Sequence, residues 1–456
     1  MKNFICTLIK IAILLLPILG EPTLLYAQTE DVDITVPAEH KEPSNRPVSR
    51  WQWSLMVVNR TGYRINEPRV LQMSRSYLDV KGIYKISDQW RLTLQALGHY
   101  DPVTRLGFSR KPSLQPREIL LDGKIGQISL SLGLQQIVWG QADGLRVLDI
   151  INPLDYREFI LEDFLDSRRP LWAIRADLPI EKGSLQLVWI PYFAPGKLPR
   201  SEDEFGLGES FGLGLLGAAF KNLPATQVET APSQRPGYQL SASQFGLRYS
   251  HSVRGWDVTA NYFYGWEDIP TPYLKELQLF PTVKLKFAPR FDRKTILGTT
   301  AATNFGPVVF RFEAGVSLDK AAAVISPNST TGFKKYRQFS SVVGLDYSPK
   351  SWLWLSGQYF LQFVSAPQQN LLLPRYHHLA SFYLRTNFLR DTLKPELFVL
   401  TGLNQKEYLI RPKITKSIGD HWKIGLGIDL LGGNSTTPFG FFRSRDRAVI
   451  ELRYLR

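Results

Sequence analysis

Short stretches that alternate apolar and polar residues recur from residue 50 to the end of the chain, and they constrain the fold most strongly. In residues 127–134, four aliphatic residues alternate with serine and glycine. The same period of two recurs at residues 256–264, 308–317, 422–430 and 447–456. Because successive side chains of a strand point to opposite faces, each stretch predicts a strand with one apolar and one polar face. Strands of about ten residues with this pattern are typical of transmembrane β-barrels.

The connections between these stretches alternate between short turns and longer loops. The short ones lie at residues 87–89, 122–126, 181–184, 253–255, 304–307, 348–351 and 419–421. Those between them are longer, apart from residues 404–407. Outer-membrane barrels place short turns on the periplasmic side and long loops outside.

Pairing strands across each long loop predicts the number of strands. The nine pairs start near residues 50/69, 89/117, 128/171, 184/238, 255/294, 307/339, 351/377, 394/408 and 421/443. We therefore predict an all-β fold, a transmembrane antiparallel barrel of about eighteen strands (16–18) over residues 49–456. Pairing of the first strand with the last would leave no exposed edge, as a bilayer requires.

Aromatic residues make up 12% of a chain whose mean hydropathy is only −0.15. Trp90, Trp256, Trp352 and Trp422 directly follow short turns, where a periplasmic aromatic girdle would lie. Ordinary core packing of these residues is the alternative, and composition alone also allows a soluble β-sandwich. The chain ends Tyr454-Leu455-Arg456, whereas outer-membrane barrels usually end on an aromatic residue.

The N-terminus has the composition of a secretory signal peptide. Lys2 and Lys10 supply positive charge, an apolar run follows, and Ala27 precedes polar residues. We predict a signal peptide over residues 1–27, cleaved near Ala27, because the apolar run is too short for a transmembrane anchor. Residues 28–48 are polar and proline-rich and predict a flexible periplasmic lead-in, and the expected location is the outer membrane. Cys6, the one cysteine, lies in this leader, so disulfides and thiolate sites are not expected in the mature chain.

The strand phase also predicts which charged residues face the lumen. The basic set is Arg91, Arg175, Arg248, Arg311, Arg385, Arg411, Lys413, Lys423, Arg443, Arg445, Arg447 and Arg453. The smaller acidic set is Asp177, Asp257, Glu313, Asp346, Asp429 and Glu451. Such a wall would focus a positive potential that favours anions. Alternatively, the arginines pair with these acids and with loop carboxylates and fill the barrel. The formal net charge of +14 suits an anionic surface or solute better than nucleic acid in an exported chain.

Three motifs with known chemistry carry little weight here. Residues 212–217 match GxGxxG without a βαβ unit, so residues 207–220 predict instead an apolar patch or short helix in a loop. His377 and His378 are adjacent and would face opposite sides of a strand, which disfavours chelation of a metal. His99 and Asp101 echo the His/Asp pairs of barrel hydrolases but have no accompanying nucleophile signature. We expect no cofactor, no metal and no enzymatic activity.

The stretch Trp139–Pro170 departs from the alternating pattern and is rich in charge. Asn152-Pro153 marks a turn, and residues 154–164 predict a helix with its aromatic residues on one side. An acidic segment at the mouth of a basic barrel is expected to fold inward, as a plug or constriction loop over residues 139–170. The alternative is an extracellular cap that does not enter the lumen.

Residues 135–170 also carry a family resemblance. The wording QQIVWGQADGLRVLDIINPLDYREF, followed by DSRRPLW, resembles the signature WGxADGLRVxDxINPxDxREF of an uncharacterised family of Gram-negative outer-membrane β-barrels, a domain of unknown function. The resemblance implies a channel or export barrel. It also implies association with an inner-membrane transporter of the resistance–nodulation–division type and with periplasmic lipid-handling proteins.

Together these observations predict an outer-membrane channel or exporter component that passes a small anionic or amphipathic, hydrophobic compound. The alternatives are a lipid-modifying barrel enzyme and a structural or adhesion barrel with a blocked lumen. The residues expected to line the lumen or constriction are Asp143, Arg146, Asp149, Asp155, Arg157, Glu158, Arg175, Arg248, Arg311, Arg385 and Arg411.

Overall fold

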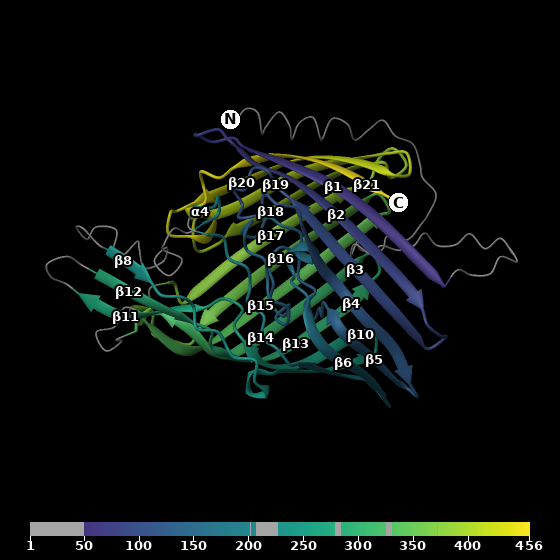
Figure 1. The fold of residues 1–456 in the computed structure, drawn as a ribbon, viewed down its shortest axis with the longest axis horizontal. Coiled ribbons are helices and arrows are strands. Elements are labelled where there is room, and N and C mark those ends of the chain that lie inside the picture. Colours follow the sequence, from purple (N-terminus) through teal and green to yellow (C-terminus); the bar gives the residue numbers. More distant parts are fainter. Residues whose placement is uncertain (1–49, 201, 207–226, 279–283, 325–330, 372) are drawn as a thin grey trace, which may run out of the picture. The chain divides into compact units, whose positions relative to one another are not determined.

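Eighteen antiparallel strands form one closed sheet in the computed structural model. The structure describes residues 50–200, 202–206, 227–278, 284–324, 331–371 and 373–456. Neighbouring strands in the sheet pair in chain order, and Figure 1 labels the barrel strands other than β7 and β9. The first and last strands close the sheet along nine paired positions, from Met56 opposite Leu455 to Arg64 opposite Arg447. The prediction of an antiparallel barrel of about eighteen strands is therefore confirmed.

The barrel strands have the following bounds: β1 (Trp51–Arg64), β2 (Leu71–Lys85), β3 (Trp90–Tyr100), β4 (Ser113–Ile125), β5 (Ile128–Gln135), β6 (Leu171–Ile180), β7 (Gly183–Ile190), β9 (Gln244–Val253), β10 (Trp256–Trp266), β13 (Arg293–Phe305), β14 (Val308–Ala323), β15 (Phe333–Lys350), β16 (Leu353–Val364), β17 (Tyr376–Thr386), β18 (Leu393–Gly402), β19 (Glu407–Ile418), β20 (Trp422–Gly433) and β21 (Arg447–Leu455). A separate three-stranded sheet contains β8 (Gln227–Thr230), β11 (Thr271–Gln278) and β12 (Lys284–Arg290). The helices of the described residues are short: α2 (Phe164–Ser167), α4 (Pro438–Phe441), η2 (Leu240–Ala242) and η3 (Gln368–Asn370).

Long and short connections alternate around the barrel, as the sequence predicted. We call the end with the short connections the turn end and the opposite end the loop end. The three-stranded sheet is built from two loop-end connections, residues 191–243 and 267–292. None of the helices within the described ranges has the length and apolar character needed to cross a membrane.

The outer faces of the strands are apolar, and the inner faces are polar. On β20, Trp422, Ile424 and Leu426 are 37–50% exposed, whereas Asp429 on the opposite face is 5% exposed. Trp51 and Trp53, at the turn end of β1, are also exposed. An apolar outer face with tryptophan near one rim is what a bilayer selects in a barrel of this kind.

Two details of the sequence prediction are wrong. Residues 154–164 do not form a helix, because Phe159 adopts a positive φ of 57° and the N–H groups of Asp155 and Tyr156 bond to Ser167 and Lys197 outside any helical turn. Arg443 and Arg445 are not strand residues, because the chain after α4 is a loop until β21 begins at Arg447.

Several other predictions fall outside the described residues. These are the signal peptide (1–27), the lead-in (28–48), the first predicted barrel residue (49), and the apolar stretch 207–220 with its GxGxxG match.

Candidate functional site: a folded segment inside the barrel

The chain turns away from the wall at the end of β5. The N–H of Ile137 donates to Asn152 Oδ1 at 2.7 Å, which folds the segment back on itself. Trp139 is 1% exposed, and its Nε1 donates to Gln186 Oε1 of β7 at 2.7 Å. Its ring also makes an edge contact with Phe263 of β10, with ring centroids 6.4 Å apart. We call residues 136–170 the inner segment. Its first residues thus pack against the inner faces of β7 and β10.

The inner segment reaches the turn-end half of the far wall. Asp143 accepts from Arg311 of β14 at 2.5 Å and from Gln358 of β16 at 2.9 Å. Glu313 of β14 accepts from the N–H groups of Gln141 and Leu148. Arg311 lies only three residues beyond the first residue of its strand, next to a short turn.

Glycines in the wall make room for this contact. A Cβ built on Gly298 of β13 would lie 2.5 Å from Leu148 Cδ2, and one on Gly315 of β14 would lie 2.9 Å from the same atom. Leu148 is fully buried as a result. Side chains at either position would push the inner segment away from the wall.

A second group of contacts lies nearer the loop end and joins two carboxylates to three wall arginines. Glu162 accepts from Arg60 of β1 and from Arg75 of β2, each at 2.5 Å. Glu158 pairs with Arg75 and, at 2.8 Å, with Arg447 of β21. All five side chains are at most 9% exposed. Burial opposes ionisation of Glu162, but Arg75 and Arg60 outweigh it and hold the pKa of that carboxyl well below its ordinary value.

These contacts extend around the whole ring of strands. In addition to the pairs above, Arg411 of β19 donates to Leu161 O at 2.8 Å and Lys294 of β13 donates to Ile150 O at 3.0 Å. Arg117 of β4 donates to Asp166 at 2.9 Å. A segment bonded to strands on all sides of a closed sheet lies within the ring of strands.

The remaining predicted residues of the inner segment pair among themselves. Asp149 forms ion pairs with Arg146 at 2.8 Å and with Arg168 at 2.7 Å, and Asp155 pairs with Arg157 at 2.5 Å. Among the acids predicted for this segment, Asp143 and Glu158 therefore contact the wall, whereas Asp149 and Asp155 hold the fold of the segment itself.

Among the predicted arginines that lie on strands, all but Arg248 have carboxylate partners within the described residues. Arg175 lies 3.2 Å from Asp177, Arg385 lies 3.0 Å from Glu396, and Arg411 lies 2.7 Å from Asp429. Arg248 has no ion pair within the described ranges, and its Nε is buried without a hydrogen-bond partner there. Most of the predicted arginines on the wall are thus paired with carboxylates.

Sequence reasoning missed Arg60 and Arg75, which lie at the centre of the loop-end cluster beside Glu162. Arg60 and Arg75 occupy directly opposite positions on β1 and β2. The first hairpin lacks a clean alternation, since apolar Val57 and Val58 are consecutive. The signal that could have found the pair is the register itself, because two like charges opposite each other need an intervening counter-charge.

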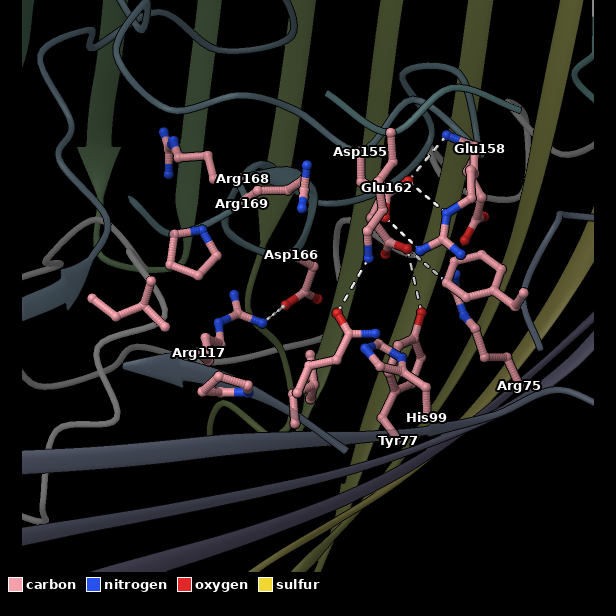
Figure 2. Close-up of a pocket in the computed structure, with 18 of the residues that line it drawn as sticks. Arg75, Tyr77, His99, Arg117, Asp155, Glu158, Glu162, Asp166, Arg168 and Arg169 are labelled. Atoms are coloured by element: carbon pink, nitrogen blue, oxygen red, sulfur yellow. Dashed lines mark hydrogen bonds and ion pairs between the residues drawn. The ribbon is translucent and has the colours of Figure 1, made fainter. Parts of the chain in front are cut away.

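A cavity of about 310 Å³ lies between the inner segment and β2 to β6. Figure 2 shows Glu158 and Glu162 on the inner segment pointing toward Arg75, with Tyr77 and His99 below them on the strands. The lining has six cationic residues (Arg75, Arg117, Arg157, Arg168, Arg169 and Lys197) and four carboxylates (Asp155, Glu158, Glu162 and Asp166). The volume is at the lower end of the range for small-molecule sites, roughly 300–1,000 Å³.

His99 and Asp101, the pair singled out in the sequence, take separate partners. His99 contacts the rings of Tyr77 and Phe108, and the Asp101 carboxylate accepts from the N–H groups of Ser74 and Val103. The lining residues of the described structure include no serine, threonine or cysteine. Nor do the described residues contain a group of three or more His, Cys, Asp or Glu that could hold a metal ion.

His377 and His378 take different partners. His377 Nε2 lies 2.5 Å from Glu407 Oε1, whereas His378 Nδ1 lies 2.6 Å from the Tyr359 hydroxyl. The two rings are therefore held by separate neighbours and do not converge on one site.

Comparisons with known proteins identify a family and a fold. A family model described as a protein of unknown function, DUF1302, matches residues 119–454. Among solved structures, the chain is similar to OccAB1 of Acinetobacter baumannii, with 6% identity, coverage of 89% of this chain and 96% of that chain, and a TM-score of 0.52. It is also similar to OccK8 (OprE) of Pseudomonas aeruginosa, with 10% identity, coverage of 89% and 98%, and a TM-score of 0.50. At such identities the likeness concerns the barrel fold alone. A search of curated proteins found no match.

Proposed function

Because this chain belongs to the DUF1302 family of proteins of unknown function, we propose a function from its lumen: a porin-like outer-membrane channel constricted by its own inner segment. The contacts of residues 136–170 with strands all round the barrel carry the proposal. An eighteen-strand barrel is wide enough to hold an aqueous channel unless something fills it. The inner segment narrows the lumen, and the solute then passes beside the cavity described above.

The cavity favours a small anionic or amphipathic compound. Six cationic side chains face four carboxylates, and aromatic and aliphatic side chains (Tyr77, Leu97, Phe108, Leu134 and Trp172) complete the lining. A positive excess in a low-dielectric space concentrates anions. The apolar part of the lining suits the non-polar portion of such a molecule.

Two other functions are separated from this one by simple measurements. A structural or adhesion barrel with a blocked lumen fits the dense ion pairing of the inner segment, and it would give no conductance. A lipid-modifying enzyme would release a changed lipid, detectable by product analysis. The association with an inner-membrane transporter and a periplasmic lipid-handling protein remains a prediction, which co-purification from membranes tests.

We expect anion-selective conductance. In a planar bilayer with a salt gradient, the reversal potential of the refolded protein should have the sign of anion selectivity. Arg248→Gln should reduce that selectivity, because this guanidinium has no carboxylate partner in the described part of the chain. Arg248→Lys keeps the charge and should preserve it. Cation-selective reversal potentials would contradict the proposed solute class, and absence of conductance would contradict the channel.

A further inference from the structure

The barrel wall has a gap at the loop end, between β4 and β6. β4 pairs with β3 from Ser113 to Gly123 but with β5 only from Ile119 to Ile125. β5 ends at Gln135, and the chain leaves the wall there as the inner segment. Residues 113–118 of β4 therefore have a strand partner on one side only, within the described structure.

The gap lies within the apolar band of the barrel. β5 has eight residues, and a strand needs about 9–11 to cross the hydrocarbon core. Leu114 on the unpaired part of β4 is 71% exposed, and Trp172 at the start of β6 is 50% exposed. These apolar side chains show that the outer face beside the gap is still suited to lipid.

An unpaired strand edge in lipid is costly, because its N–H and C=O groups have no water to bond with. Such an edge is tolerated where it borders protein or a water-filled space. Pro116 lies in the unpaired stretch, and proline in a sheet is confined to edges and bulges. The sequence of β4 is therefore adapted to an open edge.

The side chains at the gap line the cavity described above. Gln115 and Pro116 of β4, Leu134 of β5 and Trp172 of β6 share its lining with Arg75 and Glu158, which belong to the lumen. Leu171 and Ala173 are buried, so the alternation along β6 places Trp172 on the outer face. The cavity thus reaches from the lumen to the outer side of the wall.

A bulge in β4 ties the inner segment behind this gap. The register between β3 and β4 shifts so that Arg117 is the extra residue between Pro116 and Glu118. Its guanidinium donates to Asp166 Oδ1 at 2.9 Å and to Leu165 O at 2.8 Å. Bulges commonly redirect a side chain next to a functional site.

A cation without a carboxylate partner lies at the gap. Lys197 Nζ donates to Gln115 Oε1 at 3.2 Å, and within the described structure no carboxylate lies within ion-pair distance of it. Arg157 and Arg169 line the same cavity. This arrangement leaves an ammonium group available to an anionic ligand.

We propose that the gap between β4 and β6 is a lateral portal to the membrane, and that the cavity binds an amphipathic anion whose head pairs with Lys197 while its apolar tail passes Leu134 and Trp172 into lipid. This inference rests on the proposed channel function and names its substrate class. An amphipathic anion that moves by this route keeps its apolar tail out of water.

Single cysteines test the portal. In a Cys6→Ser background each introduced thiol is the only one in the chain. The thiol of Gln115→Cys should react with a charged, water-soluble thiosulfonate from the cavity and with a lipid-dissolved pyrene maleimide from the bilayer. Ile119→Cys is the matched control, since this outward residue lies on the same strand where β4 is paired on both sides, and it should react with the lipid-dissolved reagent alone. Failure of the pyrene maleimide to label Gln115→Cys would overturn the portal.

A transport measurement separates the portal from the channel. Decanoate, a ten-carbon carboxylate, is the probe, and its transfer into vesicles is followed with an enclosed pH dye. Pyrene maleimide on Gln115→Cys should slow protein-dependent decanoate transfer about tenfold and leave ionic conductance unchanged, whereas the labelled Ile119→Cys protein should behave as unlabelled protein. Unchanged decanoate transfer with normal conductance overturns the portal alone. Loss of conductance in every protein, labelled or not, overturns the channel.

Lys197 should make decanoate binding depend on pH. Burial, with Arg157 adding to it, lowers the pKa of Lys197 to about 8. The charged groups that face Lys197 are Asp155, Arg157 and Arg169, and His99 of β3 lines the same cavity. The ammonium loses its proton in this interval. Decanoate affinity should therefore fall about tenfold from pH 7 to 9, which corresponds to the loss of one charge-assisted hydrogen bond.

Two variants check that Lys197 is responsible. Lys197→Arg should bind decanoate with little change between pH 7 and 9, because a guanidinium stays charged. Lys197→Gln should bind weakly at both pH values. Lys275→Gln, an exposed lysine on β11, should keep the native affinity and pH profile. A native profile in Lys197→Arg or in Lys197→Gln would contradict the assignment of the head-group site.

Discussion

Removal of residues 141–168 should raise the single-channel conductance by about threefold or more, because a barrel of this strand number without an internal segment encloses a wide aqueous lumen. The deletion is compatible with the fold. Gln135 and Leu171 are paired neighbours on β5 and β6, and the seven residues that remain between them are enough for a hairpin loop. Planar bilayer recording of the refolded variant gives the conductance directly.

The control changes a loop-end structure that is not part of the barrel sheet. β11 and β12 pair with each other and with β8, and replacing residues 277–285 with Asn-Gly shortens their hairpin to a tight turn. Conductance should then stay at the native level. If the 141–168 deletion also leaves the conductance unchanged, the inner segment does not constrict the channel.

The barrel could be predicted from the sequence because a bilayer imposes a strict local rule on every strand. All backbone groups must pair within the barrel, one face must be apolar, and successive side chains alternate. The stretch 422–430 shows all of this with no tertiary information, and it becomes β20. The turn near residue 390 was not recognised, yet the strands on either side of it still started near the expected positions.

The fold of the inner segment could not be predicted in the same way. Its spacing of aromatic residues suggested a helix over 154–164, but the contacts that decide its conformation come from distant strands. Tyr156 donates to Asp268, and Glu158 is held by arginines of β2 and β21. Such partners outweigh the small local preference for a helix, and only the three-dimensional register reveals them. The wall gap is equally non-local, since β4 alone looks like an ordinary strand.

The largest loss of stability should come from Glu158→Ala combined with Glu162→Ala. Arg60 and Arg75 face each other on adjacent strands, and the two glutamates are the carboxylates of the inner segment that separate and neutralise them. Arg75 is fully buried, so the double variant leaves its charge without a carboxylate partner. Breaking a buried ion pair on one side costs about 3–5 kcal/mol. The free energy of unfolding in lipid vesicles, measured by urea titration, should fall by about that amount.

Two comparisons show whether burial of the charge is the cause. Asp163→Ala removes a carboxylate from the same segment, but this side chain is 54% exposed and lies 3.8 Å from Arg60, so the loss should be below about 1 kcal/mol. Adding Arg75→Leu to the double variant should restore much of the stability, because removal of both partners of a buried pair is often neutral. If the double variant unfolds at the native urea concentration, the cluster does not hold the inner segment to the wall. If Arg75→Leu instead adds a further loss, packing of the long arginine side chain against Tyr77 and Phe108, rather than its charge, is what stabilises this region.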